Sequence, residues 1–421
     1  MFSPVPAKMV DASGSRSRLP LDSLTVLLTS GCNLECQYCF RQAGSSRDLA
    51  WRDLERALVW AAATPGEELE VIFSGGEPLL AFETLRKAVK HIRHPACEGR
   101  AVEIRVLTNG LLLEDERLDF LVRHSVFVDL SFDGVPESQA ARGAGTWAAL
   151  DLLIGRIADR YPDWSADHLK VTVTLTPANL HNLADSVTYL VDRGVGGVGI
   201  SPALSRVPGW DDDRWQDLDR QLGLVSELAQ QHLAETGRVP FIPFRKYREM
   251  GPPRPKDRNP CVALEGRNPV LDVDGRLTSC MMFAPSGLDS KRPRRAEISR
   301  DLGLGRIDDR DFEKRRNGFH EDVRNRDIFR SAPELSSRYR SCSECPAADF
   351  CRICPLTLLE FGKGDSPTKV PALLCAYNYL MVEYHRKFPV QDNPTPPRVT
   401  VESLRSRMRY WDEVHAKNPG S

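Results

Sequence analysis

Three cysteines lie close together near the N-terminus of the sequence. Cys32, Cys36 and Cys39 have the spacing C-x3-C-x2-C, and Phe40 follows the last of them. Thiolates this close can bind one small metal centre. A structural zinc site needs a fourth Cys or His nearby, and the next residues, RQAGSSRDLAW, contain neither. An iron–sulfur cluster held by three cysteines leaves one iron open to an outside ligand, and the missing fourth cysteine then becomes the functional feature.

Seven more cysteines are grouped in the C-terminal half of the chain. They are Cys261, Cys280, Cys342, Cys345, Cys351, Cys354 and Cys375. Cysteines at close, regular spacing in a chain without a secretion signal indicate metal ligands and not disulfides. Two C-x2-C pairs are also typical of a zinc ribbon, so structural zinc is the alternative to iron–sulfur clusters here. Cys97 stands alone, and we interpret it as incidental.

The composition is that of an ordinary globular protein. The chain has 421 residues, of which 41% are hydrophobic and 27% charged, and its net charge is -1. This length allows two or three domains, and the charge gives no sign of a nucleic-acid partner. No apolar run is long enough to span a bilayer, and residues 1–22 lack the apolar core of a signal peptide. We therefore expect a cytoplasmic protein with a flexible lead-in over residues 1–22 and no membrane partner.

Strand-like and helix-like runs alternate from about residue 23 to residue 235. The expected strands are 24–29, 70–73, 102–107, 126–131, 170–176 and 197–201, and the expected helices are 53–63, 82–92, 116–123, 148–158, 183–193 and 211–235. Six such repeats predict an α/β fold with a parallel sheet, either doubly wound or a partial barrel. The polar segments TSGCN, SGGEP, TNG and SFDG all follow strands, at the edge where such sheets place their active sites.

The segment CNLECQYCF resembles the cysteine loop of the radical S-adenosylmethionine (SAM) enzymes. The resemblance implies a partial (β/α)6 barrel over residues 23–235. It also implies a [4Fe–4S] cluster whose open iron binds SAM, and an electron donor such as flavodoxin or ferredoxin. In this family one electron from the cluster cleaves SAM to a 5′-deoxyadenosyl radical, which abstracts hydrogen from a substrate.

The same resemblance implies which residues contact SAM. SGGEP matches the family's GGEP motif, TNG and SFDG match its polar strand ends, and TLTPANLHNL matches the segment that lines the adenosine pocket. The implied contacts are Phe40, Gly75, Gly76, Glu77, Pro78, Thr108, Asn109, Ser131, Asp133 and position 175, which is Leu175. Gln139 stands where many relatives have a histidine. Arg142 is one residue away from the family's arginine, so its assignment to the SAM carboxylate is a weaker match. The sequence identifies no catalytic base.

The C-terminal cysteines resemble those of the SPASM extension of this family. Their spacing is C-x13-G-x4-C followed by C-x2-C-x5-C-x2-C and a last cysteine. The resemblance implies a SPASM domain at 261–385 with helices. The residues themselves predict a Pro-rich linker at 236–260, a β-hairpin turning at Asp274–Gly275, and a tail with a closing helix at 386–421. The resemblance further implies two auxiliary [4Fe–4S] clusters. One would use Cys342, Cys345, Cys351 and Cys375, and the other Cys261, Cys280 and Cys354 with an unidentified fourth ligand.

Most SPASM enzymes modify peptides, so the leading hypothesis is a maturase that crosslinks or oxidises a ribosomally made peptide. The alternatives are an oxidoreductase or rearrangement enzyme for a sugar, amino acid or nucleoside derivative, and a non-catalytic scaffold. The sulfatase-maturing type has an aspartate base after the cysteine that matches Cys280, whereas this chain has Met281 and Met282. Few residues precede the first strand, so leader recognition is expected from a separate partner protein or another surface.

Overall fold

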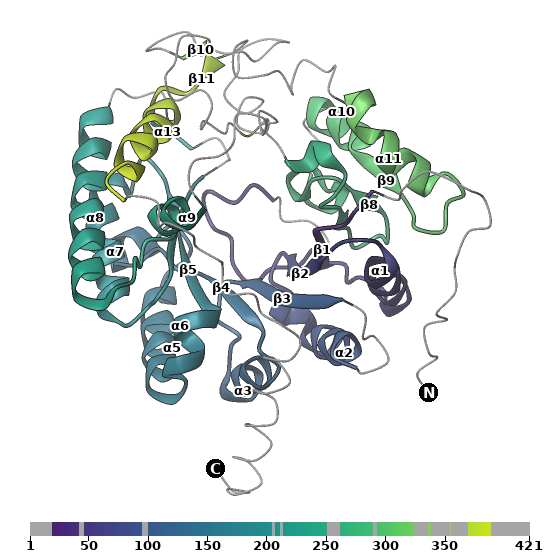
Figure 1. Ribbon diagram of the computed structural model, residues 1–421, viewed down its shortest axis with the longest axis horizontal. Coiled ribbons are helices and arrows are strands. Elements are labelled where there is room, and N and C mark those ends of the chain that lie inside the picture. The colour runs from purple at the N-terminus through teal and green to yellow at the C-terminus, as the bar shows by residue number, and fades with distance from the viewer. Residues whose placement is uncertain are drawn as a thin grey trace, which may run out of the picture.

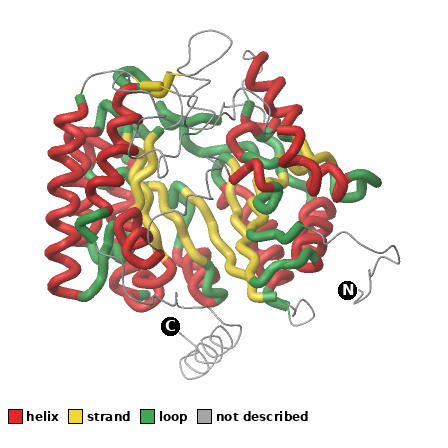
Figure 2. The backbone as a smooth tube through the Cα atoms, turned by 45° about the horizontal axis from the view of Figure 1, so that its top comes forward, coloured by secondary structure: helices red, strands yellow, loops and turns green. Residues whose placement is uncertain are grey.

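The computed structural model describes residues 19–41, 46–94, 100–203, 207–210, 214–250, 262–288, 293–323, 336–337, 354 and 369–388. The main sheet of the molecule is curved, with helices packed on its outer side (Figure 1). Figure 2 shows the strands side by side in the middle of the molecule with helices flanking them. Cys97, the lead-in over residues 1–18 and the closing helix expected after residue 401 lie outside the described residues.

Six parallel strands form the first part of the sheet. They are β1 (Ser23–Thr29), β2 (Glu68–Gly75), β3 (Ala101–Thr108), β4 (Phe127–Ser131), β5 (Leu169–Leu175) and β6 (Val198–Pro202), and they lie in the order of the sequence. The connecting helices are α1 (Trp51–Ala63), α2 (Phe82–Ile92), α3 (Asp115–Arg123), α4 (Pro136–Gln139), α5 (Thr146–Arg160), α6 (Pro162–His168) and α7 (Leu183–Asp192). A doubly wound sheet reverses its strand order at a switch point. This sheet does not, so the expected partial (β/α)6 barrel is confirmed.

The two faces of the sheet differ in chemistry because strand side chains alternate between them. On the outer face, Phe73, Ile104 and Val106 are fully buried against the helices. On the inner face, charged side chains pair across neighbouring strands. Arg105 Nε lies 2.6 Å from Glu70 Oε1 in such a pair. Burial of the outer face drives the sheet onto its helices, and the inner face is left polar.

The cysteine-rich half extends the same sheet. β7 (Val270–Leu271) pairs in parallel with β1, β8 (Leu277–Thr278) returns antiparallel to β7, and β9 (Gly303–Gly305) pairs with β8. The expected hairpin is confirmed, and Gly275 supplies its left-handed turn residue at φ +78°. We expected a separate small domain here, but β7 to β9 continue the barrel sheet beyond its β1 edge.

The remaining helices are α8 (Trp215–Thr236), α9 (Ile242–Met250), α10 (Pro293–Asp301), α11 (Phe312–Val323) and α13 (Ala372–His385). Short 3-10 turns are η1 (Pro78–Ala81), η3 (Leu180–Asn182), η5 (Val262–Glu265), η6 (Met281–Phe283) and η7 (Pro285–Gly287). A two-stranded parallel pair joins β10 (Ser336–Ser337) to β11 (Lys369–Val370). α8 confirms the long helix expected at 211–235, and α13 lies beside it (Figure 1).

Residues 240–250 differ from the linker expected there. The Val198 amide donates to the Pro240 carbonyl at 2.8 Å, and the rings of Phe244 and Phe388 stack 4.6 Å apart. Two buried aromatic side chains, Phe241 and Phe244, outweigh the prolines that suggested a linker. No helix in the described ranges is both long and apolar enough to cross a bilayer.

The cysteine-rich half also packs against the outside of α1. Arg306 Nη2 lies 2.6 Å from Asp53 Oδ1, and Trp60 Nε1 donates to Glu313 Oε1 at 2.8 Å. Arg316 is fully buried, and its Nη2 donates to the Leu19 carbonyl at 2.6 Å. These contacts and the β1–β7 pairing attach the second half to the barrel on two sides of β1.

Candidate functional site

The cysteine loop lies at the carboxyl end of β1. Cys32 and Cys39 are exposed, and Cys36 is partly buried. Burial raises the pKa of the Cys36 thiol to about 11, nearby Arg142 opposes this shift, and the neighbouring Cys39 and Cys32 add to it. The three sulfur atoms therefore lie near enough to influence one another electrostatically, at the edge of the barrel where active sites form.

The two glycines of SGGEP bring β2 against the start of this loop. A Cβ atom on Gly75 would lie 2.3 Å from the Thr29 carbonyl oxygen, and one on Gly76 would lie 2.0 Å from the Gly31 carbonyl oxygen. The Gly76 amide donates to Thr29 at 2.8 Å, and the Glu77 amide donates to Gly31 at 2.8 Å. The glycines thus allow a close approach between two backbone segments of the protein, where we had expected an approach to a ligand.

Glu77 links the ends of β2 and β3. Its carboxylate accepts hydrogen bonds from Thr108 Oγ1 at 2.7 Å and from the Asn109 amide at 2.8 Å, and it caps η1 through the Leu79 amide at 3.0 Å. Burial raises the pKa of this carboxyl group. The Asn109 side-chain amide donates to Asn33 Oδ1 at 2.8 Å, inside the cysteine loop. The SGGEP and TNG segments are therefore joined to each other and to the loop.

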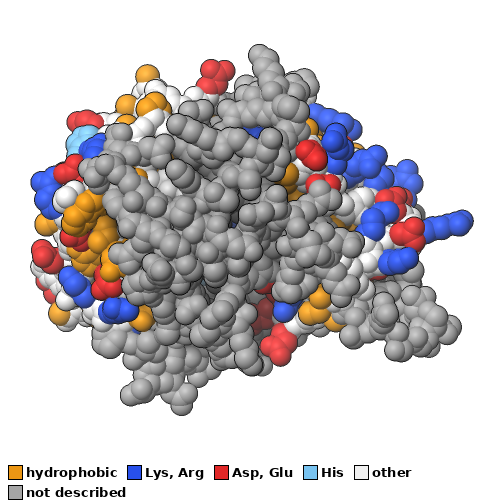
Figure 3. Space-filling model, turned by 90° about the horizontal axis from the view of Figure 1, so that it is seen from above, with side chains coloured by type: hydrophobic (Ala, Val, Ile, Leu, Met, Phe, Trp, Pro, Cys, Tyr) orange, Lys and Arg blue, Asp and Glu red, His pale blue; other side chains and the backbone are white. Residues whose placement is uncertain are grey.

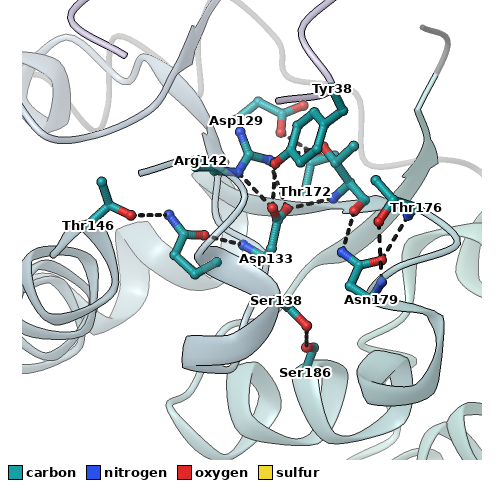
Figure 4. A network of polar contacts seen from close by, with 12 residues as sticks. Tyr38, Asp129, Asp133, Ser138, Arg142, Thr146, Thr172, Thr176, Asn179 and Ser186 are labelled. Atoms are coloured by element: carbon teal, nitrogen blue, oxygen red, sulfur yellow. Dashed lines mark hydrogen bonds and ion pairs between the residues drawn. The ribbon is translucent and has the colours of Figure 1, made fainter. Parts of the chain in front are cut away.

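A second set of contacts fixes the other side of the loop (Figure 4). The Tyr38 hydroxyl, between Cys36 and Cys39, donates to the Asp133 carboxylate. The same carboxylate accepts from Arg142 Nη2 at 2.8 Å, Arg142 Nε at 3.0 Å and the Thr174 amide at 2.7 Å. Asp133 is fully buried, and 7% of the Arg142 side chain is exposed. Desolvation alone would lower the pKa of Arg142, but the Asp133 charge more than offsets it and keeps the guanidinium charged.

This arrangement changes two expectations about the site. The Asp133 carboxylate accepts hydrogen bonds from Tyr38, Arg142 and Thr174 of the protein itself. Arg142, which we had weakly assigned to the SAM carboxylate, is the buried counterion of Asp133. Gln139 supports the same unit, because its Oε1 accepts from the Asp133 amide at 2.8 Å and its Nε2 donates to Thr146 at 3.0 Å. Sequence reasoning did not single out Tyr38, although its place between two cluster cysteines was a usable signal.

The other predicted contacts are spread over both faces of the sheet. Ser131 is partly exposed at the carboxyl end of β4, and Phe40 is partly buried against the core. Pro78 begins η1 directly after the glycine turn. Leu175 is 1% exposed and packs in the core on the helix side. Thr174, which Arg142 contacts, is its neighbour on the inner face, so Thr174 is better placed than Leu175 to face a ligand.

The second cysteine group is only partly described. Cys280 directly precedes η6, Cys375 lies in the first turn of α13, and Cys354 packs against the core. Cys261, Cys342, Cys345 and Cys351 lie outside the described residues. Among the described side chains, no group of three or more His, Cys, Asp or Glu residues is placed to hold one metal ion. A four-iron cluster uses a different iron for each thiolate, so its ligands do not converge on a single point.

The loop residues fit an iron–sulfur cluster. The donor set is three soft thiolates on one loop, which suits iron and sulfide. The ends of β2, β3 and β4 hold the loop through hydrogen bonds with Gly31, Asn33 and Tyr38. The fold and the loop together define a partial (β/α)6 barrel with a three-cysteine cluster site at the carboxyl edge of its sheet.

Comparison with known proteins agrees with this class. Residues 26–185, which run from β1 past β5 and contain the cysteine loop, match the family model described as the radical SAM superfamily. Proteins of that family bind a [4Fe–4S] cluster and SAM, and the residues here that would fit such a cluster are Cys32, Cys36 and Cys39.

Similar proteins include several with described roles. The serine-type anaerobic sulfatase-maturating enzyme of Klebsiella aerogenes is 28% identical over 34% of this chain and 39% of its own length. A tungsten-containing aldehyde ferredoxin oxidoreductase cofactor-modifying protein of Pyrococcus furiosus is 27% identical over 61% of this chain and 70% of its own length. The alignment with the maturating enzyme thus spans well under two thirds of that protein. The solved structure of anSMEcpe with bound AdoMet and Kp18Cys peptide has the same fold, with a TM-score of 0.66 and 17% identity over 87% of this chain and all of the other.

Proposed function

We propose that this chain is a SPASM-type radical SAM enzyme that abstracts hydrogen from a ribosomally made peptide and leaves a crosslink or an oxidised residue. The main support is the shared sheet. β7 of the cysteine-rich half pairs with β1, and β1 leads directly into the cysteine loop. The cysteine-rich half is therefore built against the strand that carries the cluster site. A fold neighbour solved with AdoMet and a peptide bound supports a peptide substrate.

The chain's own residues hold the reacting groups in place. Bound at Cys32, Cys36 and Cys39, a [4Fe–4S] cluster would supply the electron that cleaves SAM. Tyr38 and Asn109 fix the loop from opposite sides through Asp133 and Asn33. The inner face beneath the loop carries Ser131 and Thr174, which are polar and uncharged. The proposed role of this surface is to orient SAM and substrate while the cluster stays fixed.

Two auxiliary [4Fe–4S] clusters form part of the proposal. Cys342, Cys345, Cys351 and Cys375 would hold one, and Cys261, Cys280 and Cys354 would hold the other with a fourth ligand from outside this set. Their role would be to pass electrons between the substrate radical and an external carrier such as a flavodoxin or ferredoxin. Three clusters correspond to about twelve irons per chain.

Met281 argues against sulfatase maturation as the reaction. It packs against a small apolar cluster of Leu27, Val270, Val273 and Ala284. A thioether cannot accept a proton at neutral pH, so this position does not supply the base that a sulfatase maturase needs.

The test is anaerobic reconstitution with iron and sulfide, followed by addition of SAM and a strong reductant. We expect 5′-deoxyadenosine from the wild-type chain and none from Cys36→Ala. With a peptide encoded beside the gene, mass spectrometry should show the loss of about two hydrogens. Absence of 5′-deoxyadenosine despite a loaded cluster would overturn the enzyme assignment. Turnover of a sugar or nucleoside derivative but of no peptide would overturn the substrate class.

A further inference from the structure

A groove lies at the far end of the sheet from the barrel, on the cysteine-rich half. Its volume is about 410 Å³, and it lies between β8, β9 and the carboxyl end of α10. Its less polar lining comes from Leu277, Pro285, Gly303 and Gly305. No residue of the cysteine loop or of the barrel strands lines it, so the groove is separate from the candidate cluster site.

The rim of the groove is cationic. Arg276, Arg300 and Arg315 line it together with one carboxylate, Asp309. Arg315 pairs with Asp309 at 2.7 Å, which neutralises one cation. Arg276 is 63% exposed, and its nearest carboxylate is Asp274, 3.6 Å away. Arg300 is exposed, and its side chain has no hydrogen bond or ion pair within the described part of the chain.

The basic rim belongs to a wider pattern. Figure 3 shows Lys and Arg side chains gathered on the right of the molecule, the side where Figure 1 places α10 and α11. Opposite charges elsewhere on this surface are largely paired, as between Arg56 and Asp308 at 2.9 Å. At the groove, the exposed Arg276 guanidinium has one longer ion pair, at 3.6 Å, and the Arg300 guanidinium has none with a described residue, so both can still reach a ligand.

Glycine is needed in the strand that borders the groove. Gly305 has φ +88°, and a Cβ atom there would lie 2.4 Å from Arg315 Nη2 and 2.5 Å from Asp309 Oδ2. The missing side chain lets the Asp309–Arg315 pair lie directly over β9. Arg315 Nε also donates to the Leu304 carbonyl at 3.0 Å, which fixes this guanidinium at the rim. Gly303 has no side chain, so the backbone of β9 is not covered at this position.

We propose that this groove binds an acidic segment of the peptide substrate, away from the residues that react. The proposal rests on the proposed peptide-modifying function. Arg276 and Arg300 would receive carboxylates, which guanidinium groups bind through paired hydrogen bonds. The apolar lining of the groove would receive one apolar side chain of the peptide, between the two bound carboxylates. Such a site recognises the substrate outside the barrel and leaves the barrel free for the chemistry.

The test measures binding to the reconstituted full chain in the absence of SAM. The probe is a short fluorescein-labelled peptide of glutamate and leucine in a Gly–Ser frame, followed by fluorescence anisotropy. A second peptide with glutamine at each glutamate position tests the need for charge. The variant is R276A/R300A. Its control, R220A/R386A, removes the same charge from arginines that are 65% and 58% exposed on α8 and just after α13.

We expect the glutamate peptide to bind wild type and the control variant alike, and R276A/R300A at least about tenfold more weakly, a loss of about 1.4 kcal/mol. The glutamine peptide should bind all three weakly. Equal binding of the glutamate peptide to both double variants would overturn the proposal. Full displacement of that peptide by equimolar inorganic phosphate would also overturn it, because the site would then be a phosphate site. Formation of 5′-deoxyadenosine does not depend on this groove, so that assay tests the proposed function separately.

Discussion

The buried pair of Asp133 and Arg142 gives a quantitative prediction. Asp133→Asn keeps the shape of the side chain and removes its charge, which leaves the Arg142 guanidinium in a site where 7% of its side chain is exposed. Breaking a buried ion pair by removing one partner costs about 3–5 kcal/mol, because the other charge stays uncompensated. We expect the free energy of unfolding to fall by that amount. The Tyr38 contact should weaken as well, since a neutral amide is a poorer acceptor than a carboxylate.

The assay is equilibrium urea unfolding under anaerobic conditions, followed by circular dichroism, with iron per chain measured on the same samples. The double variant D133N/R142M removes both charges, so it should recover at least about half of the loss. Tyr38→Phe removes one hydrogen bond to a charged group and should cost about 1.5–3 kcal/mol. A loss below about 1 kcal/mol for D133N would refute the reasoning, as would a double variant less stable than D133N alone.

Three further predictions concern other parts of the chain. Gly76→Ala would place a Cβ atom 2.0 Å from the Gly31 carbonyl oxygen, so it should reduce the iron bound per chain. The control is Gly155→Ala, whose Cβ atom would have nothing within 4 Å and should leave the iron content unchanged. Equal iron contents in the two variants would contradict this prediction. Burial lowers the pKa of His385 to about 4 from 6.5, so the unfolded chain binds the additional proton. The free energy of unfolding should therefore have its full value above about pH 6.5 and fall towards pH 4, by about 1–2 kcal/mol after allowance for partial exposure. In urea titrations at several pH values, H385Q should reduce this dependence on pH. Arg316→Lys should lower the thermal midpoint, because an ammonium group cannot reproduce the fork that reaches Leu19 and Glu313, and an unchanged midpoint would refute the importance of that contact.

The helices and strands of the first half could be predicted from the sequence because each depends on a pattern within a short segment. Each strand is a short run rich in apolar or β-branched residues, and each expected helix from 53–63 to 183–193 appears within a few residues of its predicted bounds. Strand order separates a barrel from a doubly wound sheet, and it depends on pairings that no single segment encodes. The pairing of Val270 with Thr25 joins residues 245 positions apart, so no periodicity could have shown it.

The position of the cysteine loop after β1 could be predicted from the sequence, whereas the contacts that support the loop could not. Asp133 was recognised by position, but its partners come from the loop, from the turn before α5 and from β5, and only the fold brings these together. Leu175 was singled out on a segment match, while the alternation of β5 places Thr174 on the inner face. Residues 240–250 were assigned to a linker because of their prolines, although Phe241 and Phe244 gave a competing signal for burial.

The pairing of β1 with β7 has a consequence for folding and for fragments of this protein. β1 leaves the ribosome before the other strands of the described sheet, and one of its two edges finds a partner only when residues 270–271 follow. Until then a seven-residue strand, SLTVLLT, presents free backbone groups beside side chains that are all buried in the final structure. Such an edge is prone to pair with other chains. A fragment that ends after α8 would keep this edge exposed, so cutting the barrel away from the cysteine-rich half should yield an aggregating piece and not an independent domain.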